Sequence, residues 1–339
     1  MVIDGAGAPT QSLAMMIWTY DVLTILLLAL ALDGLIGDPK WLWSRTGHPV
    51  VVIGKIIAWA DRTLNHDTAP APERRLTGTV FIVGLVALAA LVGWLIVLVL
   101  QRTDFALIGE VIIASTLLAG RSLYDHVRAV ADSLAQGGLP AGREAVSRIV
   151  GRDPDKLDQA GVVRSAIESL AENFSDGVVA PAFWFALFGL PGICAYKALN
   201  TADSMIGHMS DRHRDFGWAA ARLDDLANWL PARLSARLIV LAALVMPGMS
   251  ARNALRVRKA DAARHRSPNA GHPEAAMAGA LGIALAGPRI YTSGAVDDDF
   301  MGGDGRLEAI ESDIRAALRL YIVANLALLA LIAALAWLI

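Results

Sequence analysis

The segment TVFIVGLVALAALVGWLIVLVL, from Thr79 to Leu100, decides the fold class. It runs for 22 residues without a charged side chain, and a helix needs about 20 apolar residues to cross the hydrocarbon core of a bilayer. Comparable runs occupy Ile17 to Ile36 and Ala317 to Ile339, and a shorter run, Phe105 to Gly120, contains one glutamate. These four runs predict a polytopic integral membrane protein with about four full spans.

The composition of the whole chain agrees with a membrane protein. Hydrophobic residues make up 55% of the 339 residues and charged residues 18%, whereas a soluble domain usually carries about a quarter charged residues. A formal net charge of -2 gives no case for nucleic-acid binding. The one cysteine, Cys194, excludes an internal disulfide, a zinc–thiolate cluster and an iron–sulfur site. No run of alternating polarity is long enough for a sheet, so we expect one all-α membrane-embedded domain over residues 1–339.

The basic residues predict the orientation of the chain. The first 39 residues contain no Lys or Arg, whereas six basic residues lie between Lys40 and Arg75. Because Lys and Arg are enriched in cytoplasmic loops, we expect the N-terminus outside and no signal peptide. Polar regions at 40–76, 121–176, 200–235 and 250–316 then face the cytoplasm, as in a bacterial inner-membrane protein.

The apolar segment 177–199 allows two topologies. Its Gly-Leu-Pro-Gly at 189–192 breaks a helix, so we favour a re-entrant hairpin that begins and ends on the cytoplasmic side. In the alternative, 177–199 and 236–249 both cross, and the arginines of 200–235 lie outside, against the positive-inside rule.

Two polar clusters lie where a membrane protein rarely tolerates charge without a use for it. The first holds Asp33 and Asp38 at the inner end of the first run, followed by His48. Either acid alone could be a helix-end anchor, but two acids among glycines favour a site.

The second cluster repeats every four residues at Arg164, Glu168, Glu172 and Asp176, so the four share one helix face, with Asn173 beside them. A solvated face with an Arg164–Glu168 pair would explain part of the pattern. Glu172 and Asp176, however, are like charges one turn apart, which favours a cation or a substrate between them.

Three further clusters carry oxygen ligands of the kind that magnesium prefers. In the first of them, Asn200 and Asp203 share a helix face. In the second, Asp224, Asp225 and Asn228 lie at helical spacing, and the arginines on either side, Arg222 and Arg233, are suited to binding phosphate. The last is a polar loop with Asn269, His272 and Glu274 before a small-residue helix. Structural salt bridges or helix caps remain possible for each cluster taken alone.

Taken in order, these clusters resemble the adenosylcobinamide-phosphate synthase (cobinamide synthase, CobD/CbiB) family. The resemblance rests on DGLIGDP from Asp33, GHPV from Gly47, ESLAENFSDGVVAP from Glu168, YKALNTADSMIGH from Tyr196, ARLDDLANWLPAR from Ala221 and SPNAGHPEA from Ser267. It reaches from residue 31 to about 294. At Leu285-Ala286-Gly287-Pro288, where the family pattern leads us to expect a Gly-Gly pair, the sequence departs from that pattern, which concerns only the local backbone geometry.

The resemblance implies an ATP- and Mg²⁺-dependent ligase of cobalamin biosynthesis, which joins the free propionate of adenosylcobyric acid to (R)-1-amino-2-propanol or its O-phosphate. It implies the lipid bilayer as environment and leaves room for a homo-oligomer and for contact with other membrane-associated corrinoid-assembly enzymes.

The residue roles that follow are hypotheses. Metal ligation is assigned to Asp33, Asp38, Asp176, Asp203, Asp224 and Asp225. ATP binding is assigned to Lys197, Asn200, Arg222, Asn228, Arg233 and Asn269. Catalysis is assigned to His48, Glu168, Glu172, Asn173, His272 and Glu274, with His48 or His272 taking the proton of the amine.

Two other classes fit parts of the sequence. Asp224-Asp225-Leu-Ala-Asn228 also resembles the aspartate-rich motifs of membrane prenyl or alcohol-phosphate transferases, which would use an isoprenoid diphosphate and no ATP. A transporter with a midplane site at the 177–199 break predicts internal repeats and acids deep inside spans; we find no repeats, and the acids gather at span ends and in loops. The chain has no G-x-x-x-x-G-K-[ST] loop, so any nucleotide site is non-standard.

Overall fold

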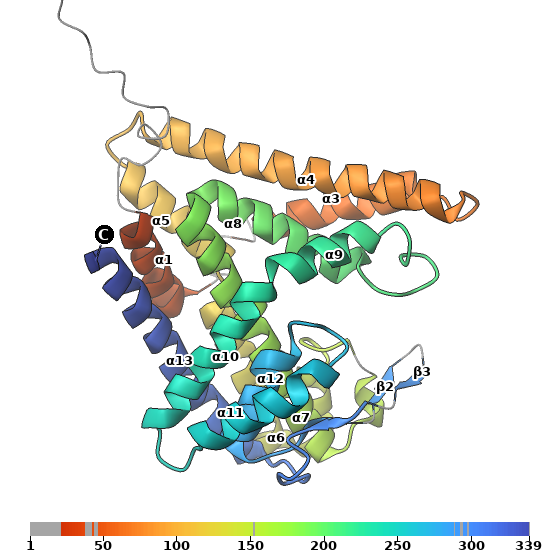
Figure 1. Ribbon diagram of the computed structural model, residues 1–339, viewed down its shortest axis with the longest axis vertical. Coiled ribbons are helices and arrows are strands. Elements are labelled where there is room, and N and C mark those ends of the chain that lie inside the picture. Colours follow the sequence, from red (N-terminus) through yellow and green to blue (C-terminus); the bar gives the residue numbers. More distant parts are fainter. Residues whose placement is uncertain are drawn as a thin grey trace, which may run out of the picture.

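The structure, a computed structural model, describes residues 22–37, 43, 47–151, 153–287, 289–291, 294–296 and 298–338. It confirms the prediction of an all-α fold (Figure 1). The α-helices, with the labels of Figure 1, are α1 (Val22–Ile36), α3 (Pro49–Leu64), α4 (Ala71–Leu100), α5 (Ala106–Leu117), α6 (Gly120–Val146), α7 (Gln159–Phe174), α8 (Ala180–Ile206), α9 (Trp218–Ala227), α10 (Trp229–Val245), α11 (Ala251–Asp261), α12 (Gly271–Leu281) and α13 (Glu311–Leu338).

Short elements complete the described chain. They are the 3₁₀ turns η1 (Pro154–Lys156) and η3 (Ala262–Arg264), the π-helical turn η2 (Ser175–Val179), and the strands β1 (Leu285–Ala286), β2 (Arg289–Tyr291), β3 (Gly294–Val296) and β4 (Phe300–Met301). Strand β1 pairs antiparallel with β4, and β2 pairs antiparallel with β3. The sequence predicted no strands, since segments of two or three residues are too short to show alternating polarity.

Helix length and composition confirm a membrane protein with several spans. Four helical stretches are long and apolar enough to cross a bilayer: Ala71–Leu100, Ala106–Val146, Gln159–Ile206 and Glu311–Leu338. Helices α9 and α10, bent by 46° at their junction, could form a fifth span together. Helix α1 has 15 described residues, and the predicted run from Ile17 to Asp21 lies outside the described part of the chain.

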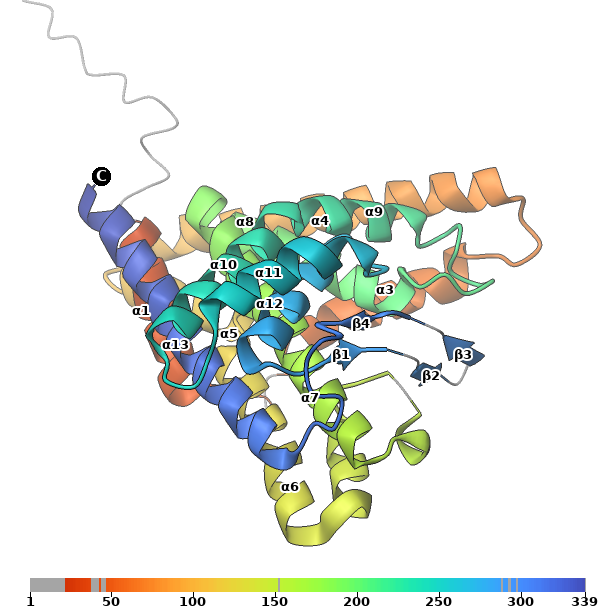
Figure 2. The ribbon, with the colours of Figure 1, turned by 60° about the horizontal axis from the view of Figure 1, so that its bottom comes forward.

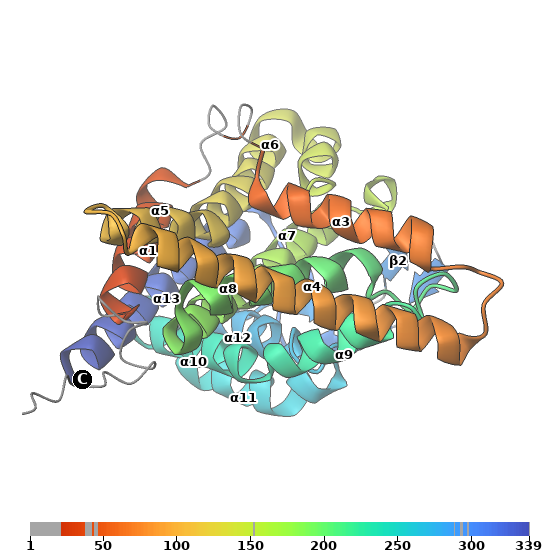
Figure 3. The same ribbon diagram turned by 90° about the horizontal axis from the view of Figure 1, so that it is seen from above.

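Helix α4 follows directly from its sequence. A proline in its first turn fixes a helical φ where no backbone N–H bond is lost. The helix is 30 residues long, and its last 22 residues, from Thr79, carry no charge. Large side chains such as Val80, Leu88 and Leu95 stay exposed, as expected for a surface that faces lipid. Figure 3 shows α4 across the molecule, with α3 and α8 beside it.

Helix α8 contains a sharp break. Its backbone leaves the helical region at Gly189 (φ 59°, ψ -148°), within the Gly-Leu-Pro-Gly segment. The arm after the bend packs along α4. Gly93 of α4 lies against Leu190 and Pro191 at the bend, and Gly78 lies against Phe216 in the segment that follows α8. The two segments therefore run antiparallel (Figure 1). Whether this hairpin is re-entrant stays a prediction.

The core has two parts. The larger cluster joins α1, α6, α7, α10, α12 and α13, and a smaller one lies between α3, α4 and the second arm of α8. Helix α7 is buried along most of its length, with Ile167, Leu170 and Phe174 fully enclosed. Among the predicted site residues of this segment, Glu168 is buried and Asp176 half-buried, whereas Glu172 and Asn173 are exposed.

Candidate active site

Three aspartates from different elements meet where η2, α8 and α9 converge. Tyr196 of α8 links two of them, Asp176 and Asp224, since its hydroxyl lies 3.0 Å from the carbonyl oxygen of Asp176 and 2.9 Å from Oδ1 of Asn228. The amide Nδ2 of Asn228 in turn donates to Oδ2 of Asp224 at 2.8 Å. The structure thus brings the predicted second, third and fourth clusters to one place.

This aspartate cluster (Asp176, Asp203 and Asp224) concentrates negative charge. Asp176 lies within electrostatic range of Asp224, Glu172 and Asp203. Among the described residues, no Lys or Arg side chain lies within 4.0 Å of these three carboxylates, and the one basic neighbour is the imidazole of His208, which interacts with Asp203. Like charges at this separation are unfavourable unless a cation or protons neutralise them, so the cluster favours a positively charged ligand.

The cluster alone does not form a complete metal cage. Within the described ranges, no three His, Cys, Asp or Glu side chains are grouped closely enough to hold one ion. Magnesium usually takes only one or two protein carboxylates and completes its octahedron with water and substrate phosphate oxygens. The donor set therefore fits Mg²⁺ bound together with a phosphate-bearing ligand.

A cavity of about 430 Å³ lies beside the cluster. It is polar, and its charged and imidazole-bearing lining residues are Glu168, Glu172, His208, His265, Arg266, Glu274 and Asp298. Glu172 and His208 connect it to the aspartates, because Glu172 interacts electrostatically with Asp176, and His208 with Asp203. A substrate in this cavity would lie beside the negative charge of the cluster.

The loop before α12 reaches the end of α9. Asn269 donates from Nδ2 to the carbonyl oxygen of Asp225 at 2.8 Å. The hydroxyl of Ser267 accepts from the backbone N–H groups of Asn269 and Ala270, which fixes the turn into α12. The fifth predicted cluster therefore joins the others through a contact between residues 44 positions apart.

Glu168 is a buried acid with a backbone partner. Its carboxylate Oε1 accepts from the N–H of Ala286 at 2.7 Å, and the residue is 3% exposed. The solvated-face interpretation is therefore wrong for Glu168. Arg164 donates to the carbonyl oxygen of Leu307 at 2.8 Å.

Ala286 lies in the segment 285–288, where the family pattern led us to expect a Gly-Gly pair. Its φ of 60° lies in the left-handed region, which costs an L-residue about 1–2 kcal/mol. Glycine removes this strain but also increases the conformational entropy of the unfolded chain, which opposes folding. We therefore expect Ala286→Gly to raise the free energy of unfolding by a net amount of roughly 0.5–1 kcal/mol. A thermal unfolding midpoint in detergent would measure it; an unchanged or lower midpoint would show that the strain is absent.

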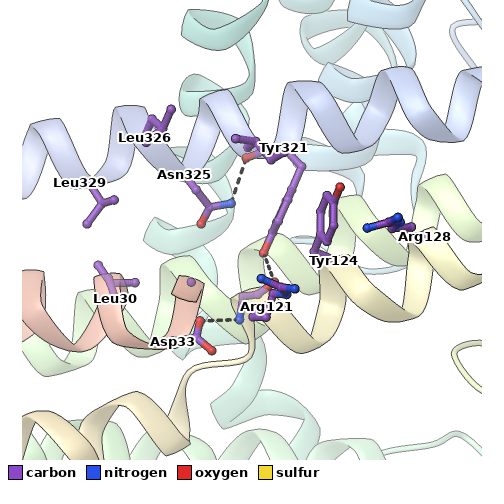
Figure 4. Close-up of a pocket in the computed structure, with 12 residues that line it drawn as sticks. Leu30, Asp33, Arg121, Tyr124, Arg128, Tyr321, Asn325, Leu326 and Leu329 are labelled. Carbon is purple, nitrogen blue, oxygen red and sulfur yellow. Dashed lines mark hydrogen bonds between the residues drawn. The ribbon is translucent and has the colours of Figure 1, made fainter. Parts of the chain in front are cut away.

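Several predicted site residues lie outside this region. Asp33 lines a separate pocket of about 480 Å³ between α1, α6 and α13, where its Oδ2 accepts from the N–H of Gly120 at 2.8 Å (Figure 4). Asp38 lies outside the described residues. His48 begins α3 as an N-cap, with Nδ1 accepting from the N–H of Val50 at 3.2 Å.

Of the other predicted site residues, some lie at the aspartate cluster and some lie elsewhere. Lys197 lines an almost wholly apolar cavity of about 340 Å³ between α3, α4 and α8. Asn173 donates to its own helix at Ser169. Asn200 does reach the cluster, since its Nδ2 lies 3.4 Å from Oδ1 of Asp224. Arg222 pairs loosely with Asp225 at 3.8 Å.

Tyr196, His208 and His265 carry no role in the sequence-based hypothesis, yet all three belong to the site. Tyr196 precedes Asn200 by four residues, so helical spacing alone places it on the same face. His265 lies 3.8 Å from Glu274 across the cavity. No local pattern predicts that contact, because it depends on how η3 folds back on α12.

Comparison with known proteins agrees with the quoted motifs. The family profile described as "CobD/Cbib protein" matches residues 26–321. The Cobalamin biosynthesis protein CobD of Brucella suis biovar 1 (strain 1330) is 54% identical to this chain, and the match covers 88% of this chain and 92% of the relative. The protein of the same name from Rhizobium meliloti (strain 1021) is 52% identical, with 90% of this chain and 94% of the relative covered. A protein of that name from Rhodobacter capsulatus is 44% identical over 88% and 92%. No solved structure matches the chain. With this coverage and identity, the chain belongs to the CobD/CbiB family.

Proposed function

We propose that the protein is an amide-forming ligase of cobalamin biosynthesis, which joins the free propionate of adenosylcobyric acid to aminopropanol or its phosphate at the expense of ATP. The name shared by the relatives supports the pathway. The observation that carries the chemistry is the aspartate cluster, which has no Lys or Arg partner among the described residues and lies beside a polar cavity. We place the cavity on the cytoplasmic side, where ATP is available.

The aspartates would hold magnesium together with the phosphates of ATP. Asp176, Asp203 and Asp224 supply the carboxylates, and Tyr196 and Asn228 fix the positions of the surrounding elements. Bound magnesium neutralises charge on a phosphoryl group during its transfer. An unactivated carboxylate reacts poorly with an amine, so we propose that the propionate first takes the γ-phosphoryl group and releases ADP.

The cavity residues would then handle the amine. The amine nitrogen forms the C–N bond, inorganic phosphate leaves with the electrons of the C–O bond, and a proton passes from nitrogen to a base. Burial, together with the charges of Arg233 and Arg258, lowers the pKa of His272 to about 4, and a base of that pKa accepts protons poorly near pH 7. We therefore assign proton acceptance to His265, whose imidazole lines the cavity.

An end-point assay on the detergent-solubilised protein tests the proposal. With adenosylcobyric acid, aminopropanol phosphate, ATP and Mg²⁺ present, mass spectrometry should detect an amide product and ADP, and each omission should abolish both. A folded protein that forms no product with the free or the phosphorylated amine would contradict the proposal. Consumption of an isoprenoid diphosphate would then favour the transferase, and uptake of an unmodified solute into proteoliposomes the transporter.

A further inference from the structure

Three arginines and a histidine gather where α10, α11 and α12 pack together (Figure 2). Arg233 and Arg237 lie one turn apart on α10, Arg258 lies on α11, and His272 is in the first turn of α12. Arg233 lies within electrostatic range of Arg258 and Arg237, and His272 within range of Arg233 and Arg258. We call these four residues the basic cluster.

The basic cluster has no counter-charge in the described chain. Thirteen other arginines place a guanidinium nitrogen within 4.0 Å of a carboxylate oxygen. Among the described residues, Arg233, Arg237 and Arg258 have no such carboxylate, although they repel one another. Gathering like charges without a partner costs free energy that an anion would recover.

Two donors of the cluster also lack partners. The Nε atom of Arg258 and the Nδ1 atom of His272 are buried and make no hydrogen bond within the described part of the chain. A buried polar atom without a partner costs about 1–3 kcal/mol, so such atoms are uncommon and usually mark a missing ligand, water or ion. Here both belong to groups that can donate to an oxyanion.

One arginine of the cluster is held in place before any ligand binds. The guanidinium of Arg233 lies 4.3 Å from the ring centre of Trp229, and its Nη1 donates to the carbonyl oxygen of Trp229 at 2.7 Å. Stacking and this hydrogen bond leave the other guanidinium nitrogens available and reduce the entropy lost on binding. The amino end of α12, where His272 lies, adds the positive end of a helix dipole.

We propose that Arg233, Arg237, Arg258 and His272 form a binding site for a phosphoryl oxyanion, carried either by a soluble phosphate compound or by the headgroup of an anionic phospholipid. Arginine binds phosphate through paired N–H donors, which matches the three guanidinium groups. A lipid headgroup is one of the two sources because Arg237 is exposed on α10, a helix that belongs to a candidate membrane span. The site does not depend on the amide-forming reaction, because binding can be measured without turnover.

Calorimetric titration with pyrophosphate tests the site in the full-length protein, reconstituted in nanodiscs of zwitterionic lipid. EDTA is present throughout, so that binding through magnesium at the aspartate cluster does not contribute. We expect saturable binding that weakens at least about tenfold in Arg258→Gln and further in Arg237→Gln/Arg258→Gln. The matched control is Arg252→Gln, which removes the same charge from an exposed position of α11 and should leave the affinity unchanged.

A second titration, in nanodiscs that contain phosphatidylglycerol, identifies the source of the phosphate. Competition that weakens pyrophosphate binding in the wild type and disappears in Arg258→Gln assigns the site to a lipid headgroup. Unchanged affinity assigns it to a soluble phosphate compound. Absence of saturable binding in both nanodisc preparations, or equal loss in Arg252→Gln and Arg258→Gln, would overturn the proposal. Neither result would bear on the ligase assay.

Discussion

Asp224→Asn is expected to lower the rate of amide formation at least about a hundredfold while the protein still folds. Asp224 is 7% exposed and accepts hydrogen bonds from Asn228 and Asn200, so it links α9 to α8 at the centre of the aspartate cluster. Asparagine keeps the shape and one acceptor oxygen but removes the negative charge. The rate of ADP-linked product formation by purified protein measures the effect.

Asp211→Asn provides the control for this variant. Asp211 lies in the loop between α8 and α9 and its side chain is fully exposed, so its replacement changes the net charge equally without touching the cluster. It should retain wild-type activity. Both variants should elute as monodisperse protein with wild-type unfolding midpoints. Full activity in a folded Asp224→Asn protein would remove the aspartate cluster from the chemistry.

The membrane character could be predicted from sequence because its cause is local. A span requires about 20 consecutive apolar residues whatever lies elsewhere in the chain, so Thr79 to Leu100 and Ala317 to Ile339 mark α4 and α13 directly. The bend of α8 was equally local, since glycine and proline at 189–192 disrupt a helix wherever they occur.

The assembly of the site was only partly predictable. Helical spacing placed Glu168 and Glu172 on one face, and both line the cavity. Spacing could not show that Asp33 bonds to Gly120 in a different pocket, or that Asn269 reaches the carbonyl of Asp225. Such contacts depend on tertiary packing between distant segments. The π turn at 175–179 is a further example, because it shifts the helical register at Asp176 and the sequence gives no signal for it.

The same dependence on packing makes Gly78→Ala strongly destabilising. Gly78 lies where α4 meets the chain between α8 and α9, and a Cβ atom there would overlap the backbone carbonyl of Phe216. Backbone cannot move aside as a flexible side chain can, so the helix must shift and the smaller core cluster around Phe216 must open. We expect a loss of about 3 kcal/mol or more, seen as a fall of roughly 5 °C or more in the unfolding midpoint.

Gly84→Ala on the same helix separates this clash from the general effect of losing a glycine. No heavy atom lies within 4 Å of a Cβ at Gly84, and alanine is the better helix former by about 1 kcal/mol, so this variant should be as stable as the wild type or more so. Because both substitutions add one methyl group to α4, a difference between them reports the contact with Phe216 alone. Equal unfolding midpoints for the two variants would mean that α4 does not pack against the second arm of α8 and the following loop as described. The position of this α8 segment beside the aspartate cluster would then be wrong as well.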